Sequence, residues 1–217
     1  NVLMQSKRHF RSSGAYALPG QTFSVTRTDN ANVETTIFIN TLRSGATHEF
    51  QTDGYKRPKH LQSSKFSITP GQTLPLTSSY GGPIQIGFDT NNQNVAFTFT
   101  QVGEHPYWNG EEDNIFFTAA LAQADYDWAE MVTPGFEVHS KIEKMQTSLS
   151  ESPWSSPAEI AAATERYVHN YPHILAGFQG PGIDTVNEII DFASSRGWQV
   201  DTIDLVKHMN ADQANCG

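Results

Sequence analysis

The sequence has a single cysteine, Cys216, so it can form no intrachain disulfide. This excludes the small disulfide-stapled scaffolds, although it leaves secretion open. The sequence also lacks an apolar run of about 18 residues, the length that would predict a membrane-spanning helix. The chain begins at Asn1 with neither an initiator methionine nor a signal peptide. We therefore interpret it as a piece of a longer protein.

Charged residues are few. They make up 17% of the chain, whereas Ser, Thr, Asn and Gln together number 64. A surface rich in neutral polar side chains is more usual outside the cell than in the cytosol. Apolar residues make up 37% of the chain and 24 residues are aromatic, which is enough to build a sizeable core and excludes global disorder.

Basic residues are scarce in the second half of the chain. Residues 1–103 carry a net charge of +4 and residues 104–217 a net charge of -13. The acidic half argues against nucleic acid or an anionic membrane surface as a partner. The split predicts two units of different character that divide near Gly103.

The first unit has the pattern of short strands. Apolar residues alternate with polar ones over residues 84–88 and 95–99, and Gly, Pro and Asn clusters separate such runs. Period-2 runs bounded by turn residues are typical of a sandwich or barrel. We predict a leader or linker over residues 1–13 and a β-sandwich over residues 14–103.

The second unit, residues 104–217, has the pattern of helices. Ser156 begins a capping box with Pro157 at the first helical position, and this helix should stop before Pro172. Further elements are predicted as helices after Glu111, over 138–149 and over 184–196, and as a buried strand over 200–206. The predicted fold class is therefore α+β, a β-sandwich followed by a mostly helical segment.

Two histidine patterns invite a search for a metal site. His48 and Glu49 begin an H-E-x-x-H motif, but Thr52 stands where the second histidine must be. His169 and His173 have the helical i, i+4 spacing, but Pro172 lies between them and should end the helix that would align them. Neither pattern predicts a zinc site.

Other catalytic signals are weak. The chain has no G-x-S-x-G elbow, and the glycine-rich loop at 177–182 contains Pro181 and is followed by no Walker lysine. Aromatic and polar residues gather at 104–109, a composition that suits sugar or peptide binding, although packing between the two units is favoured. The residues alone reveal no catalytic constellation.

Four segments carry a resemblance to a known family. They are ALPGQTFSVT at 17–26, SSYGGPIQI at 78–86, YDWAEMVTPGFE at 126–137 and DLVKHMNADQ at 204–213. The first two resemble the enhancin-like zinc metallopeptidases, the second through an S-x-x-G-G-x-I turn and strand. The last two are similar to the bacterial, ImpA/TagA-like, mucin-degrading branch. The resemblance extends from about residue 14 to residue 217.

The resemblance implies a secreted or surface-displayed bacterial zinc peptidase that cleaves mucin-type O-glycosylated proteins. Its β-sandwich would lead into a thermolysin-like catalytic unit, with zinc held by H-E-x-x-H and a later Glu. No segment of this chain matches that motif, so no catalytic or metal-binding residue is assigned. We expect zinc in the longer parent protein, and we expect this chain alone to hold none and to cleave nothing.

Three residues are candidates for contact with substrate in a cleft: Trp108, His208 and Asp212. Two other interpretations stay open. The first is a glycan-binding sandwich of an adhesin or colonisation factor, motivated by the aromatic cluster at 105–108. The second is a purely structural spacer.

Overall fold

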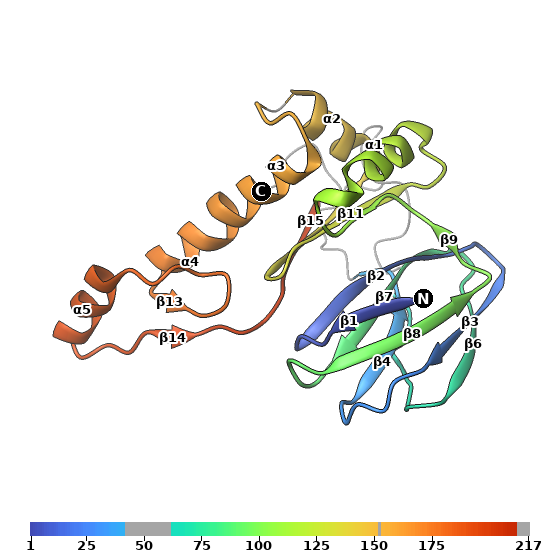
Figure 1. Ribbon diagram of the computed structural model, residues 1–217, viewed down its shortest axis with the longest axis horizontal. Helices are drawn as coiled ribbons and strands as arrows, with labels where there is room; N and C mark the ends of the chain where they lie inside the picture. The colour runs from blue at the N-terminus through green and yellow to red at the C-terminus, as the bar shows by residue number, and fades with distance from the viewer. Residues whose placement is uncertain (42–61, 152, 212–217) are drawn as a thin grey trace.

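The computed structural model describes residues 1–41, 62–151 and 153–211. Two large sheets lie at one side of the molecule, and the helices and a smaller sheet lie at the other (Figure 1). This arrangement confirms the predicted α+β class. None of the described helices is long and apolar enough to cross a membrane.

Two antiparallel sheets make up the amino-terminal part. The first has the order β1 (Val2–Gln5), β8 (Asn94–Thr100), β3 (Thr22–Arg27) and β6 (Thr73–Thr77). The second has the order β5 (Phe66–Ser67), β4 (Thr35–Ile39), β7 (Gly82–Phe88), β2 (His9–Ala17) and β9 (Gly103–Glu104). The alternating pattern read from residues 84–88 and 95–99 corresponds to β7 and β8.

The two sheets share one hydrophobic core. Phe23 on β3 and Val95 on β8 contribute from the first sheet, and Ile37 on β4 and Ile84 on β7 from the second, and all four are completely buried. Burial of each such side chain contributes about 1.5–3 kcal/mol. The period-2 pattern thus places one face of each sheet inside.

Residues 1–13, predicted to be a leader or linker, instead contribute two strands. β1 pairs antiparallel with β8, with Val2 opposite Phe97, and β2 begins at His9 and pairs with β7. The reason for the difference lies in the run Val2-Leu3-Met4, which is apolar without alternation. A short edge strand of this kind carries no period-2 signal.

The S-x-x-G-G-x-I segment contains a turn in which two positions, Gly81 and Gly82, accept only glycine. Gly81 and Gly82 have φ angles of +65° and +137°. A Cβ at Gly81 would lie 2.2 Å from the carbonyl oxygen of Ala17, and one at Gly82 would lie 2.0 Å from Asn40 Oδ1. Asn40 Nδ2 donates a 2.9 Å hydrogen bond to the Gly81 carbonyl. The turn therefore fixes where β7 starts beside β2 and β4.

A third sheet begins the second part. Its order is β10 (Tyr107–Trp108), β11 (Trp128–Val132), β12 (Phe136–Lys141) and β15 (Lys207–Ala211). The β10–β11 and β12–β15 pairs are parallel, and the β11–β12 pair is antiparallel. Residues of this sheet share a core with α1 (Asn114–Gln123), α2 (Ile142–Glu151) and α3 (Pro157–Thr164). A 3₁₀ turn, η1 (Glu111–Asp113), precedes α1.

The second part is therefore less helical than predicted. The helix expected over 138–149 starts at Ile142, because residues 136–141 form β12. The strand expected over 200–206 is replaced by the short β14 (Asp201–Thr202) and by β15. The polar residues Glu137 and His139 on β12 are buried against another sheet, whereas a sequence pattern assigns such residues to solvent.

The helix that begins after Ser156 does not stop before Pro172. After α3 it widens into a π-helical segment, η2 (Glu165–Asn170), and continues as α4 (Tyr171–Leu175). Proline lacks an N–H and its ring clashes with the carbonyl one turn earlier, and a wide turn relieves both problems. Beyond it, α5 (Asn187–Ser195) and the small β13 (Phe178–Gln179)–β14 pair complete an arm that extends away from the sheets (Figure 1).

Candidate functional site

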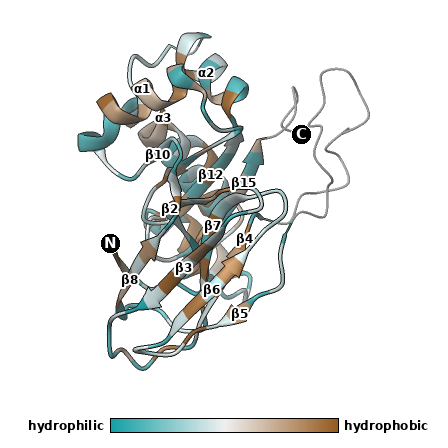
Figure 2. Ribbon diagram, turned by 90° about the vertical axis from the view of Figure 1, so that its right-hand side faces the viewer, coloured by the Kyte–Doolittle hydropathy of each residue, from teal (hydrophilic) through white to brown (hydrophobic). Residues whose placement is uncertain are grey.

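The junction between the second and third sheets is built from buried polar side chains. Figure 2 shows β12 and β15 above β2 and β7. Ser12 on β2 and Gln85 on β7 meet Glu130 on β11 and the pair Glu137 and His139 on β12, and all five are buried. Buried polar groups need partners, so these side chains constrain one another strongly.

Glu137 connects the two sheets directly. Its Oε1 lies 2.9 Å from Arg11 Nε, and its Oε2 accepts hydrogen bonds from the Ser12 amide (3.1 Å) and the Ser12 hydroxyl (2.9 Å). Burial raises the pKa of Glu137, although the Arg11 guanidinium opposes this shift. The carboxylate thus receives one fixed cation and two hydrogen-bond donors from β2.

Glu130 accepts hydrogen bonds from three side chains. Its Oε2 lies 3.0 Å from His105 Nε2, and its Oε1 lies 2.7 Å from His139 Nδ1 and accepts a 2.6 Å hydrogen bond from Gln85 Nε2. Burial raises the pKa of Glu130, but the hydrogen bonds from His105 and His139 outweigh it and hold the pKa well below its usual range. Because an ionised carboxylate can only accept hydrogen bonds, the Nδ1–H of His139 is the donor of the hydrogen bond to Glu130 Oε1.

His208 enters the same cluster from β15. It pairs with Glu137 in the register of the parallel strands, and its ring stacks on Phe10 with centroids 3.7 Å apart. Burial lowers the pKa of His208 to about 2, so the imidazole is neutral. Neutral imidazole is the form that binds metal ions.

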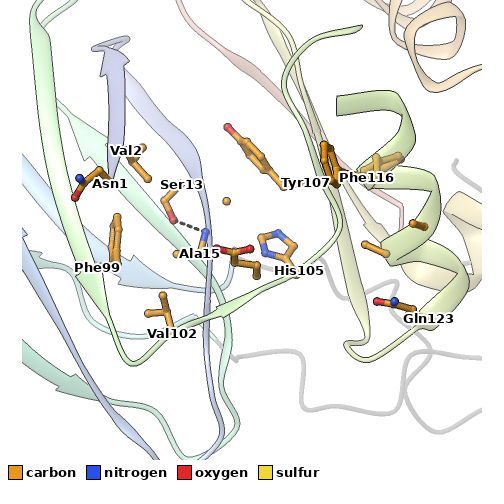
Figure 3. Close-up of a pocket in the computed structure, with 15 residues that line it drawn as sticks. Asn1, Val2, Ser13, Ala15, Phe99, Val102, His105, Tyr107, Phe116 and Gln123 are labelled. Atoms are coloured by element: carbon orange, nitrogen blue, oxygen red, sulfur yellow. Dashed lines mark hydrogen bonds between the residues drawn. The ribbon is translucent and has the colours of Figure 1, made fainter. Parts of the chain in front are cut away.

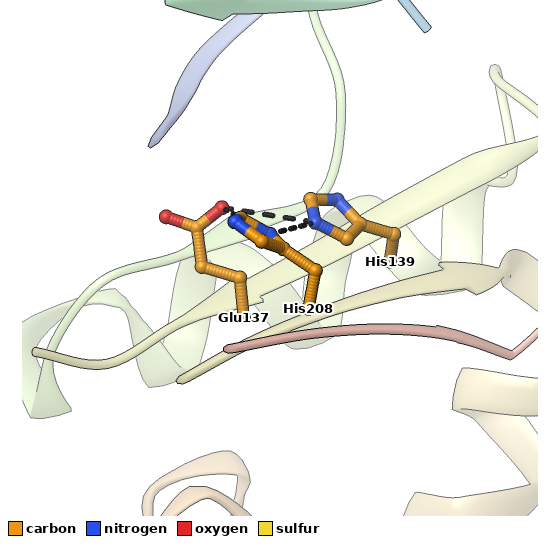
Figure 4. A group of neighbouring side chains, drawn as sticks. All are labelled: Glu137, His139 and His208. Atoms are coloured by element: carbon orange, nitrogen blue, oxygen red, sulfur yellow. Dashed lines mark hydrogen bonds and ion pairs between the residues drawn. The ribbon is translucent and has the colours of Figure 1, made fainter. Parts of the chain in front are cut away.

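Three of these side chains present ligand atoms to one another (Figure 4). His139 Nε2 lies 3.0 Å from His208 Nδ1, and Glu137 Oε2 lies 3.7 Å from each of these nitrogens. Glu137 and His139 are two residues apart on β12 and share a face, and strand pairing brings His208 beside them. Within the described ranges, this is the group of histidines and carboxylates arranged to hold a metal ion.

A pocket of about 610 Å³ lies nearby, between β2, β8 and α1 (Figure 3). Burial raises the pKa of Tyr107, at its wall, above the ordinary range of a phenol. Gly14, with φ of +76°, lies against that ring, and a Cβ there would be 3.1 Å from Tyr107 Cδ1. Aromatic rings beside polar groups suit a sugar or peptide ligand. Other lining residues include Ser13, Phe99, His105, Phe116 and Gln123.

Of the predicted cleft residues, Trp108 on β10 and His208 on β15 lie on strands at opposite ends of the third sheet. Trp108 is buried, its Nε1 donates a 2.8 Å hydrogen bond to Asn114 Oδ1, and it packs in the core with Phe117 rather than facing an open cleft. His208 lies in the cluster described above. Asp212 lies outside the described residues.

The two histidine patterns of the sequence, one at His48 and one at His169 and His173, differ in outcome. His48 and Glu49 lie outside the described residues. His169 and His173 stay on one continuous helix with ring centroids 4.8 Å apart, but the described residues around them form no metal-binding group.

Sequence reasoning missed Glu130, Glu137 and His139. The two-residue spacing of Glu137 and His139 is a strand signal, but the helix predicted from residue 138 separated them. Glu130 sits inside the apolar run of β11, where a buried carboxylate is itself a functional signal.

The sequence and the fold are similar to those of one class of protein. Residues 2–100 match the N-terminal domain of M60-like peptidases. The amino-terminal part of the chain is therefore similar to this domain, and the predicted resemblance to the enhancin-like metallopeptidases is confirmed.

Particular relatives extend the match. The chain is 28% identical over 230 residues to the immunomodulating metalloprotease of Pseudomonas aeruginosa, an alignment that covers 100% of this chain and 25% of the relative. The solved IMPa metallopeptidase of Pseudomonas aeruginosa superposes with a TM-score of 0.71 at 25% identity, over 97% of this chain and 25% of that one. The chain thus spans about a quarter of the length of these relatives.

Two further structures were solved with ligands. IMPa in complex with an O-glycopeptide superposes with a TM-score of 0.70 at 24% identity, covering 97% of this chain and 26% of that one. The M60 catalytic domain of Clostridium perfringens ZmpC, in complex with the sialyl T antigen, superposes with a TM-score of 0.63 at 11% identity. This match covers 99% of this chain and 42% of that one. At these identities the likeness shows the fold alone.

Proposed function

We propose that this chain is the amino-terminal part of a secreted or surface-displayed bacterial zinc metallopeptidase that acts on mucin-type O-glycosylated proteins. The match to a metalloprotease along the whole chain supports the peptidase class. The T-antigen and O-glycopeptide bound by similar proteins support the substrate class. In this proposal the two large sheets are a β-sandwich, and the third sheet with α1–α3 opens a thermolysin-like catalytic unit.

The chain's own role is to hold the sandwich against the catalytic unit. The observation that carries this role is the Glu137 carboxylate, which is fully buried and bound to Arg11 and Ser12 across the junction. A buried ion pair that is also hydrogen-bonded fixes the relative orientation of the two elements that supply it. The chain contains no H-E-x-x-H motif, so its residues do not supply the family's zinc site and no catalytic step is assigned to them.

The test compares two proteins, this chain and a longer one in which it is joined to a catalytic unit of the relatives' type. Both are incubated with an O-glycosylated mucin, with and without a chelator. We expect cleavage by the longer protein, its loss with chelator, and no cleavage by this chain. A mucin stripped of its O-glycans is the control substrate. Cleavage by the chain alone, or none by the longer protein, would contradict the proposal.

A second candidate function is glycan binding by the amino-terminal part, favoured by the pocket beside Tyr107. The burial of Trp108 counts against a sugar-binding surface at 105–108, because a stacking platform must be exposed. A glycan array probed with this chain decides between the two. Binding that a Tyr107→Phe variant loses would support the lectin function, and a blank array would exclude it.

A further inference from the structure

We propose that Glu137, His139 and His208 bind one divalent transition-metal ion, with Zn²⁺ as the representative, at the junction between β2 and the third sheet. The inference concerns residues of this chain alone. It therefore stands or falls independently of any cleavage by a longer protein.

The spacing of the three ligand atoms fits an ion of this kind. The two nitrogens are 3.0 Å apart, and each is 3.7 Å from Glu137 Oε2. A point equidistant from atoms at these separations lies about 2.0 Å from each, which is the normal length of Zn–N and Zn–O bonds. An ion slightly out of their plane keeps these lengths and leaves a position for a fourth ligand.

The ligands are already held in the required orientation. The Nδ1–H of His139 donates a hydrogen bond to Glu130, so the lone pair of Nε2 points toward His208 and Glu137 and, without the ion, accepts a hydrogen bond from His208 Nδ1–H. Binding of the ion replaces that hydrogen bond, and the imidazole of His208 stays neutral by carrying its proton on Nε2 instead of Nδ1. Glu137 is fixed by Ser12 and Arg11. A carboxylate behind a metal-binding imidazole fixes its tautomer and raises its basicity, an arrangement common around protein metal ions.

The charges at the junction also favour a cation. Glu130 and Glu137 are two completely buried carboxylates, and Arg11 forms an ion pair with Glu137 but not with Glu130. A divalent ion supplies the positive charge that a second buried carboxylate needs. The His208 side chain keeps 10% of its surface exposed, so the cluster meets solvent at this ligand.

The ion would act as a clamp. Its ligands come from β12 and β15, whose histidines are 69 residues apart in the chain. Through Glu137 it is also linked to β2. Binding would therefore stabilise the sheet edge formed by β15 and the junction together, because an ion that binds only the folded state stabilises it by mass action.

The test uses the purified chain after treatment with a chelator and exhaustive dialysis. Titration with ZnCl₂ in a calorimeter should show one equivalent bound and a rise in melting temperature. Titration with CoCl₂ should give the visible d–d absorption of a nitrogen-ligated ion. In a His208→Gln variant the affinity should fall at least about 100-fold. His173→Gln, which removes a histidine outside the cluster, should keep the wild-type affinity.

Two results would overturn the proposal. If the wild-type chain binds no Zn²⁺ at micromolar concentrations, the cluster is a buried histidine–histidine hydrogen bond and nothing more. If His208→Gln binds as tightly as wild type, the ion lies elsewhere. Glu137→Gln removes the partner of Arg11 and can unfold the junction, so His208→Gln, which leaves that pair intact, is the deciding variant. Circular dichroism of the zinc-free variants confirms that each is folded.

Discussion

Glu130 on β11 lies directly opposite His139 on β12 in the antiparallel register, and its Oε1 accepts a 2.7 Å hydrogen bond from His139 Nδ1. Both side chains are completely buried. The carboxylate thus sets which ring nitrogen of His139 faces the rest of the cluster.

Replacing Glu130 by Gln tests this relationship. The neutral amide is a weaker hydrogen-bond acceptor for His105 and His139 than the carboxylate, and we expect the zinc-free chain to lose about 2 kcal/mol of unfolding free energy. Zinc affinity should fall about 10–100-fold, because His139 loses its orienting carboxylate. Urea denaturation and calorimetric titration measure the two effects. Glu188→Gln, on the exposed surface of α5, is the matched control and should change neither.

Removing the ion should loosen one strand more than the others. After chelation, the amides of β15 should exchange with deuterium faster, since this strand lies at the sheet edge and supplies His208. The amides of β3, in the core of the other part, should keep their rates. Equally faster exchange in β15 and β3 would indicate a general loss of stability. Unchanged exchange in β15 would contradict the proposal that the ion stabilises this strand.

The Gly-Gly turn gives a prediction about stability. In a Gly82→Ala variant the new Cβ would lie 2.0 Å from Asn40 Oδ1, far inside van der Waals contact, at a residue whose φ is +137°. We expect a loss of about 3 kcal/mol or more in unfolding free energy, measured by urea denaturation. Gly20→Ala is the control, because its φ of +70° is also positive but nothing lies within 4 Å of a Cβ there. It should cost about 1 kcal/mol, the backbone penalty alone.

Asp29 gives a prediction about pH. Burial raises the pKa of Asp29, but hydrogen bonds from Arg27 and from the amides of Ala96 and Ala31 outweigh it and leave the pKa below its usual value. A carboxyl whose pKa is lowered by folding adds stability above its unfolded pKa of about 3.9 and loses it as the pH falls toward the folded value. The Asp29→Asn variant should therefore be less stable at pH 7 by about 1.5–3 kcal/mol.

The pH profile itself provides the check. Unfolding free energies of the wild type and of Asp29→Asn, measured from pH 7 to pH 2.5, should converge as the pH falls below about 4. Asp89→Asn gives a comparison with another carboxylate that caps a backbone amide, that of Glu34. A constant gap between wild type and Asp29→Asn over the whole range would show that the effect of the substitution is not electrostatic.

Much of the first part of the fold could be predicted from the sequence. Alternation in the segments that become β7 and β8 is strong because one face of each sheet is buried and the other is not. The strand β1 was not predicted, because an apolar run without alternating polar residues lacks the two-residue periodicity of a strand. The S-x-x-G-G-x-I turn was recognised as a motif, but the contacts of Gly81 and Gly82 with Ala17 and Asn40 are visible only in three dimensions.

The site could not be predicted, for a physical reason. Glu130, Glu137 and His139 are polar residues in strands, and a sequence pattern assigns polar positions to solvent. Here the solvent face of one sheet is covered by another, so the polar alternation is buried. His208 was singled out from the sequence, but its partners depend on strand pairing between residues 69 positions apart.

The parallel pairing of β12 with β15 has a further consequence. Everything between these strands, α2 through β14, leaves the sheet at Lys141 and returns at Lys207 one strand away. The helical arm lies within this segment, whose two ends are fixed by neighbouring strands, and the cost of closing such a segment grows only slowly with its length. A longer or shorter arm would therefore leave Glu137, His139 and His208 in their places on β12 and β15.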